Sequence, residues 1–280
     1  MLRILGRRDR GRRQTPDDAS RPLGGDRGRK HPGRVIGVLN YKGGTGKTTT
    51  VVNLAAGLAL RGARVLCIDL DAQGGLATSL DVRYTHSLAD LLLGRSKPSA
   101  CVVQARENLD LIASDRSLLR AEGELWRIGE KAKQGLAERM RGVVGYDYVF
   151  LDYSPSLSLI GECGLRYNRE LIVPVAMSYM ALVGTRQVIE TLKVVNDDLP
   201  GHRVRLSLIV PTFYDGRQRI DREIIELLHR YFADRVAEPI RASVKLSEAT
   251  SRGMTIYEYA PRSSGAIDYV RLVERVARSG

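Results

Sequence analysis

Cysteine and histidine, which often mark disulfide-bonded or metal-binding proteins, are scarce in this chain. It has three cysteines and four histidines in 280 residues, and the cysteines share no metal-binding or redox spacing. Cys67 lies inside an apolar run, where a small buried core residue is expected. No run approaches the roughly 20 apolar residues that a membrane helix needs. The first eight residues are too short and too charged for a signal peptide, so we expect a protein of the reducing cytoplasm.

Acidic residues are in deficit, and the deficit is uneven. The chain carries 44 basic and 32 acidic residues, a formal net charge of +12. Residues 1–34 hold 11 basic and 4 acidic residues (+7), residues 35–200 hold 19 and 18 (+1), and residues 201–280 hold 14 and 10 (+4). Basic ends on a nearly neutral body indicate a polyanionic partner, with nucleic acid ahead of an acidic membrane surface.

The first 33 residues differ in composition from the rest. They are rich in Arg, Gly, Asp and Pro and lack hydrophobic periodicity, so we expect disorder there. Such a tail is either an electrostatic arm or docking segment, or a solubilising leader. From residue 34 to residue 280, apolar strand-like runs alternate with helical patterns. This alternation predicts a single α/β domain with a mostly parallel twisted sheet and helices on both faces.

A glycine-rich loop at residues 40–50 follows an apolar run and precedes a helical pattern. Gly43, Gly44 and Gly46 let the backbone curl so that successive N–H groups face one anion. The helix that follows adds the positive end of its dipole. Lys47 is placed to reach the β- and γ-phosphates, and the Thr48 hydroxyl to hold Mg²⁺. The sequence therefore predicts a site for a nucleoside triphosphate and Mg²⁺.

Two further apolar runs end in carboxylates. The run at residues 64–69 leads directly to Asp71, and the run at residues 146–152 ends in Asp152. Ligands bind beyond the carboxyl ends of strands in such sheets. Asp152 is therefore expected to face Mg²⁺ and its waters.

The octet at residues 42–49, Lys-Gly-Gly-Thr-Gly-Lys-Thr-Thr, resembles the deviant Walker A motif of the ParA/MinD family of ATPases. The resemblance covers about residues 34–279 and is strongest to small, Soj-like ParA partition ATPases, which have the SIMIBI type of P-loop NTPase fold. It implies that Lys42 reaches across a dimer interface to the phosphates bound by the partner. The residues that it assigns to ATP are Lys42, Gly43, Gly44, Thr45, Gly46, Lys47, Thr48, Thr49, Pro211 and Phe213.

The same resemblance assigns catalytic roles, together with Lys42 and Lys47, to both aspartates. Asp71 matches the family residue that positions the attacking water, and Asp152 the residue that begins the switch; both are expected to reach Mg²⁺ through water. Several positions depart from the family pattern in these loops and in the later segment 240–246. The departures are Ala72 for proline, Gly75 for asparagine, Tyr153 for a small residue, Ser154 for proline, Ala242 for arginine and Ser243 for asparagine.

These features predict an ATPase that forms a homodimer with ATP, binds DNA nonspecifically and positions a chromosome, plasmid or other large cargo on the nucleoid. Slow hydrolysis would be stimulated by a ParB-like partner. The DNA contacts are expected from Arg217, Arg241 and Lys245. The alternative is a MinD-like membrane-associated ATPase. We consider it less favoured because no basic amphipathic segment follows the closing helix, although the apolar residues among the first eight keep it open.

Two packing expectations complete the sequence analysis. The apolar stripe of the closing helix at residues 266–278, formed by Ile267, Val270, Val273 and Val276, is expected to pack into the core. Residues 115–142 are expected to form a charged, exposed helix in which Trp126 is a packing residue.

Overall fold

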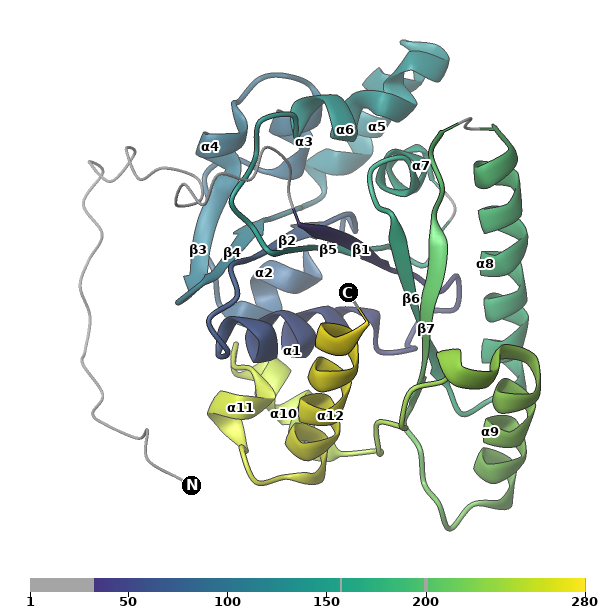
Figure 1. Ribbon diagram of the computed structural model, residues 1–280. Coiled ribbons are helices and arrows are strands. Elements are labelled where there is room, and N and C mark those ends of the chain that lie inside the picture. Colours follow the sequence, from purple (N-terminus) through teal and green to yellow (C-terminus); the bar gives the residue numbers. More distant parts are fainter. Residues whose placement is uncertain (1–32, 157, 199–200, 280) are drawn as a thin grey trace, which may run out of the picture.

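The computed structural model describes residues 33–156, 158–198 and 201–279. Its centre is a seven-stranded sheet in the order β3-β4-β2-β5-β1-β6-β7 (Figure 1). β3 pairs with β4 in antiparallel fashion, and every other described pairing is parallel. The strands are β1 (Arg34–Val38), β2 (Val65–Asp69), β3 (Val102–Arg106), β4 (Leu109–Ile112), β5 (Tyr148–Asp152), β6 (Glu170–Ala176) and β7 (Arg205–Thr212).

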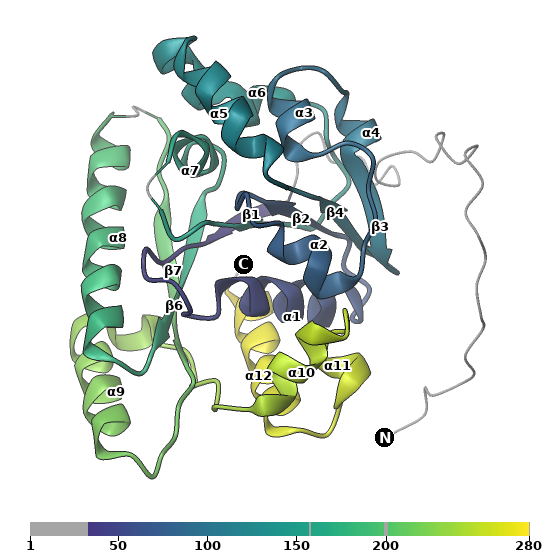
Figure 2. The same ribbon diagram turned by 180° about the vertical axis from the view of Figure 1, so that it is seen from behind.

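Helices cover both faces of the sheet, as the sequence predicts (Figures 1 and 2). One face packs against α1 (Lys47–Ala59), α2 (Gly75–Leu80), α10 (Val244–Ser251), α11 (Ile256–Tyr259) and α12 (Ser264–Arg278). The opposite core includes residues of α3 (Leu88–Leu92), α4 (Pro98–Cys101), α5 (Ser117–Trp126), the 3₁₀ segment η1 (Gly129–Gln134), α6 (Gly135–Arg139), α7 (Leu159–Leu165), α8 (Tyr179–Asp198) and α9 (Arg219–Phe232).

The central strands belong to both cores because their side chains alternate between the two faces. In β1, Val35 faces the core that contains α7 and α8, whereas Ile36 and Val38 face the core that contains α1. The carboxyl ends of β1, β2 and β5 lie side by side, since Val38 and Asp69 both pair in register with Asp152. This edge of the sheet therefore carries the phosphate loop and both predicted acidic loops.

Some local predictions were wrong. The edge strand β3 was not predicted, and the helix expected over residues 115–142 is divided into α5, η1 and α6. Gly129 adopts a φ of 77°, a left-handed conformation that ends a regular helix. Trp126 was expected to pack, but its exposed fraction is 60%. In α12, Val273 and Val276 are buried as predicted, whereas Ile267 (44% exposed) and Val270 (39%) are not. Residues three apart drift around a helix by about 60° per step, so Ile267 lies away from the side that Tyr269 and Leu272 bury.

Among the described residues, no helix is both long and apolar enough to cross a bilayer. The predicted disordered tail, residues 1–33, lies outside the described residues except for Gly33. All three cysteines are buried and free, as expected for Cys67.

Candidate nucleotide site

The phosphate loop leaves β1 and enters α1 through Gly46, whose φ of 82° places it in the left-handed region. Only glycine adopts this conformation readily, so the loop requires it where the helix begins. Lys47 is the first residue of α1, and Thr48 and Thr49 follow in its first turn. No acidic side chain lies in that turn. The positive end of the helix is therefore free to stabilise an anion.

Hydrogen bonds fix the loop to the sheet at both of its ends. The buried Asn40 side chain donates to the Pro174 carbonyl (2.8 Å) and accepts from the Lys42 N–H (2.9 Å). The Thr212 hydroxyl, at the end of β7, donates to the Thr45 carbonyl (2.9 Å). The sequence analysis assigned no role to Asn40 or Thr212, because the Asn40–Pro174 and Thr212–Thr45 bonds join segments that are remote in the chain.

Lys47 is buried, and its Nζ donates to the Lys42 carbonyl of its own loop (3.3 Å). Burial lowers the pKa of Lys47, and the charges of Asp152 and Asp71 oppose that shift. A buried ammonium with a single backbone acceptor retains donors for phosphate oxygens. This position agrees with the predicted phosphate-binding role.

Asp152 and Asp69 form a pair of buried carboxylates next to Lys47. Burial raises the pKa of Asp152 well above its usual range, and the Asp69 charge adds to this effect, while the Lys47 ammonium opposes it. Neither carboxylate oxygen of Asp152 has a hydrogen-bond partner among the described residues. A buried carboxylate without partners is expected to serve a ligand. The carboxylate and the Thr48 hydroxyl are oxygen donors of the kind that Mg²⁺ prefers, so these residues fit the predicted Mg²⁺ role.

Asp69 is a residue whose importance the sequence analysis missed. Its carboxylate accepts from the N–H groups of Asp71 (2.9 Å) and Leu76 (3.0 Å), so it shapes the whole Asp71 loop. Burial raises its pKa to about 7 despite these donors. Its position as the last residue of β2 was the available signal, but its partners depend on the fold of the loop.

Asp71 lies half-buried in a turn in which its carboxylate accepts from the Gln73 N–H (3.0 Å). The departure at Gly75 has a structural consequence, because a Cβ atom there would lie 3.3 Å from Thr48 Cγ2. Because residue 75 is glycine, the start of α2 can lie close to Thr48 of the phosphate loop. The Asp71 charge also acts on the ammonium of Lys47, so Asp71 lies on the same side of the loop as the phosphate-binding lysine.

Tyr153 fixes the beginning of the switch that follows Asp152. The side chain is buried and its hydroxyl donates to Asn168 Oδ1 (3.2 Å). A Cβ atom at Gly37 or at Gly164 would lie within 2.7 Å of Tyr153 atoms, so both glycines make room for the ring. Among the described residues, the Ser154 hydroxyl forms hydrogen bonds only with the neighbouring Ser156. The part of the switch that can move therefore begins after Tyr153.

The remaining predicted nucleotide residues lie around this centre. Lys42 is exposed, and its amino group forms no ion pair with any described residue. Gly43 and Gly44 are exposed on the same loop, and Thr45 is buried. Phe213 is half-exposed at a φ of 57°, and its ring would lie 3.7 Å from a Cβ atom at Gly46, which places it beside the loop. Pro211 is buried in β7.

The predicted DNA contacts lie elsewhere, at the junction between the β7–α9 turn and α10, and each is ion-paired. Arg217 pairs with Asp215 (2.7 Å) and Lys245 with Glu248 (2.8 Å), all at exposed positions or nearly so. Arg241 forms a two-pronged bond with the buried Asp268 of α12 (2.7 and 2.9 Å). Arg241 therefore joins the segment before α10 to α12 as well as presenting charge.

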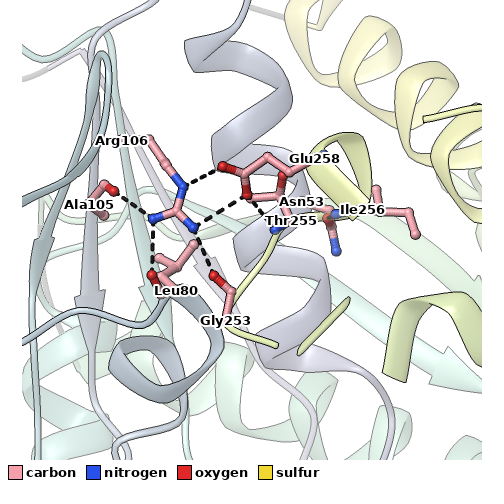
Figure 3. Close-up of polar contacts among 8 residues, drawn as sticks. All are labelled: Asn53, Leu80, Ala105, Arg106, Gly253, Thr255, Ile256 and Glu258. Carbon is pink, nitrogen blue, oxygen red and sulfur yellow. Dashed lines mark hydrogen bonds and ion pairs between the residues drawn. The ribbon is translucent and has the colours of Figure 1, made fainter. Parts of the chain in front are cut away.

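Arg106, on the unpredicted strand β3, links the acidic loop region to this C-terminal region (Figure 3). Its guanidinium donates to the carbonyls of Leu80, at the end of α2 (3.0 Å), and Gly253, after α10 (2.8 Å). It also pairs with Glu258 of α11 (2.6 Å). Burial alone would raise the pKa of Glu258, but the Arg106 hydrogen bonds lower it. Asn53 of α1 completes the group by accepting from the Ile256 N–H (2.9 Å).

Comparison with known proteins agrees with this geometry. A family profile described as an AAA domain matches residues 33–204. The chromosome-partitioning ATPase Soj of Thermus thermophilus is 39% identical over 87% of this chain and 95% of its own length. The chromosome partitioning protein ParA of Caulobacter vibrioides is 32% identical over 88% of this chain and 94% of its own.

Solved structures show the same fold. Cobyrinic acid a,c-diamide synthase from Mycobacterium smegmatis, crystallised with an ATP analogue and magnesium, superposes with a TM-score of 0.73 at 29% identity, covering 88% of this chain and 95% of that one. MinD from Pyrococcus horikoshii with Mg-ADP superposes with a TM-score of 0.73 at 24% identity, over 87% and 95% of the two chains. With the phosphate loop, the two buried aspartates and the relatives in agreement, the chain belongs to the ParA/Soj branch of the ParA/MinD family of P-loop ATPases.

Proposed function

We propose that this protein binds ATP and Mg²⁺, dimerises with ATP, binds DNA without sequence preference and positions a chromosome, plasmid or other large cargo on the nucleoid. The observation that carries the proposal is the contrast between two lysines of one loop. Lys47 is buried beside Asp152, whereas Lys42 is exposed and unpaired among the described residues. A second lysine free at the loop surface is suited to contact phosphates held by another protomer. The names of the Soj and ParA relatives support the partitioning role.

In this proposal each site residue of one protomer has a separate role in ATP hydrolysis. Mg²⁺, when bound, would supply positive charge against the negative charge that develops on the phosphates. Thr48 and Asp152 would hold it, the latter through water. Lys47 would bind the transferred phosphoryl group, and Asp71 would orient the attacking water in line with it. The half-buried Asp71 carboxylate accepts from one described backbone N–H, that of Gln73, and this light restraint on the side chain favours slow turnover until a ParB-like partner engages.

The proposed homodimer can be tested by replacing Lys42. We expect Lys42→Ala to bind ATP with nearly unchanged affinity but to stay monomeric, because the exposed amino group is placed to act between protomers. Size-exclusion chromatography with ATP and with ADP measures the dimer. Lys193→Ala, which replaces an exposed lysine of α8, is a matched control that should dimerise. A Lys42→Ala protein that dimerises like the wild type would contradict the role of this lysine.

The proposed DNA site must exchange ion pairs for phosphate contacts. Arg217 and Lys245 pair with exposed or partly exposed carboxylates, and such pairs contribute little because water and salt screen them. Arg241 is held more firmly, since its partner Asp268 is buried. We therefore propose that Arg217 and Lys245 exchange their carboxylate partners for DNA phosphates, and that Arg241 contributes less to DNA binding. Dimerisation would double these charges, which is how ATP would turn on a weak electrostatic site.

A salt titration of DNA binding tests this proposal. In the presence of ATP, Arg217→Glu is expected to weaken binding and lower the slope of log affinity against log salt by about one unit for each DNA phosphate that the variant no longer binds. Deletion of residues 1–33 is expected to weaken binding and flatten its salt dependence without changing ATP turnover. Arg186→Glu on α8, another exposed paired arginine, is the control. An unchanged slope after deletion would confine the site to the folded body. Binding to anionic vesicles in place of DNA would favour the MinD-like alternative.

A further inference from the structure

The free side of α5 presents an unusual combination of exposed side chains. Leu119 and Trp126 are each 60% exposed. They are seven residues apart, and at 3.6 residues per turn they lie on the same side of the helix, two turns apart. Figure 1 shows α5 at the top of the molecule, projecting away from the sheet. Large apolar side chains exposed together on one helix often mark a site of protein interaction.

This stripe is separate from the face that anchors the helix. Leu118, Ala121 and Leu125 are buried in the core and hold α5 against the body. Leu119 and Trp126 are therefore not needed for the helix to pack, and neither belongs to the nucleotide site. Ile128, 58% exposed just after the helix ends, extends the apolar surface toward η1.

Unpaired positive charge borders the apolar stripe. Arg116, Arg120 and Arg127 are exposed, and in the part of the chain that the structure describes they form no ion pair. Their helical positions place them along the side of the stripe away from the core. The acidic residues of α5 are already engaged, because Glu124 pairs with Arg95 (2.9 Å) and Glu122 accepts from a backbone N–H. The surface thus offers an apolar stripe and a basic border.

The shape and charge of this surface favour one kind of binding partner over a second copy of the chain, DNA or a bilayer. A second copy would bring the same arginines against these arginines, which is unfavourable. DNA would use the arginines and leave Leu119 and Trp126 uncovered. A bilayer needs a broad apolar face, whereas here the main apolar face of the helix is buried in the core. We propose that α5 docks an acidic amphipathic helix of a partner protein, packing apolar residues on Leu119 and Trp126 and carboxylates on the arginines.

The position of α5 gives this docking a consequence for ATP hydrolysis, an inference that rests on the proposed function. Glu122 accepts a hydrogen bond from the N–H of Leu159, the first residue of α7 (2.7 Å). α7 begins directly after the switch that starts at Asp152. Lys133 of η1 bridges Glu130 to Glu162 of α7 (both 2.9 Å). A partner bound to α5 would therefore act on the end of the switch opposite to Tyr153, and we assign the surface to regulation of turnover.

The experiment uses the full-length protein with ATP and a displayed library of short helical peptides. Each peptide carries a Leu/Phe stripe, and its flanking positions are randomised between Glu and Lys. Peptides with Glu at these positions are expected to be enriched over their Lys counterparts. The enriched peptide is then synthesised and titrated while tryptophan emission is recorded, since Trp126 is the single tryptophan of the chain. Binding should shift the emission to the blue and shield it from acrylamide.

Variants locate the site and link it to turnover. Arg120→Glu combined with Arg127→Glu, and separately Leu119→Asp, are expected to weaken peptide binding at least about tenfold. Arg230→Glu on α9 is the matched control and should bind normally. The peptide should change ATP turnover of the wild type and not of the double variant, whose basal turnover should be unchanged.

Three outcomes would overturn the docking proposal: no preference for Glu over Lys, binding that survives the α5 substitutions, or a Trp126 shift with phosphatidylglycerol vesicles and not with any peptide. Because peptide binding is measured by fluorescence, it does not depend on hydrolysis. A protein that binds the acidic peptide but neither hydrolyses ATP nor binds DNA would contradict the proposed function and leave the docking site standing. A protein that hydrolyses ATP and binds DNA but selects no acidic peptide would contradict the docking site and leave the proposed function standing.

Discussion

Replacement of Lys47 by alanine is expected to abolish measurable ATP binding, lowering affinity by at least about 100-fold, or roughly 3 kcal/mol. Of the two lysines of the loop, Lys47 is the buried one, and its ammonium lies next to Asp152 and Asp71. Its removal leaves those carboxylates facing the phosphates without the compensating charge. The β- and γ-phosphates would then meet net negative charge in a site of low polarity.

Titration with a fluorescent ATP analogue measures this effect, and two controls sharpen it. Lys42→Ala removes the other lysine of the same loop and is expected to retain binding, so the pair separates phosphate binding from dimerisation. Circular dichroism checks the fold, because Lys47 also donates to the Lys42 carbonyl. A folded Lys47→Ala protein that binds ATP like the wild type would contradict the assignment of the phosphate site.

Replacement of Asp71 by alanine is expected to reduce ATP turnover by about 100-fold while ATP binding and the ATP-dependent dimer persist. Its side chain is half-buried in a loop organised by Asp69, and the loop approaches Thr48 through Gly75. The phosphate and Mg²⁺ ligands are other residues, so loss of Asp71 removes orientation of the water and leaves binding intact. The result should be a trapped dimer.

Single-turnover assays and size-exclusion chromatography with ATP measure the two halves of this prediction. Asp71→Asn is the matched variant, because an amide oxygen can still accept from the Gln73 N–H and keep the turn. If the asparagine variant is as slow as the alanine variant, the carboxylate itself is required. Turnover of Asp71→Ala at the wild-type rate would mean that another group orients the water.

The nucleotide centre was predictable from sequence because its residues lie at fixed offsets from strand ends. The phosphate loop follows one short buried strand and Asp152 ends another, and parallel pairing brings those strand ends together. The roles of Asn40, Asp69 and Thr212 were not predictable in this way. Each acts through a backbone group of another segment, and those contacts exist only once the sheet order is set.

The edge of the sheet and the surface helices were harder to predict for a different reason. β3 is a short edge strand whose side chains are mostly half-exposed, so it lacks the continuous apolar run of the central strands. Arg106 therefore appeared as an ordinary surface charge, although it joins three segments remote in sequence. Trp126 was expected to pack because buried tryptophan is common, but the narrow core-facing side of α5 is filled by smaller residues.

The fit between Tyr153 and the two glycines has a consequence for how this chain can diverge. The ring occupies the volume that a side chain at position 37 or 164 would need, and its hydroxyl binds Asn168. A homologue with a small residue at position 153 would leave a void there, which larger residues at 37 and 164 could fill once Leu70, Asn168 and Leu171, which also crowd these glycines, had shifted. The three positions should therefore vary together, and a single exchange at any of them should be tolerated poorly. In a set of related sequences, covariation of 153 with 37 and 164 would distinguish chains whose switch is anchored at its first residue from chains whose switch is free there.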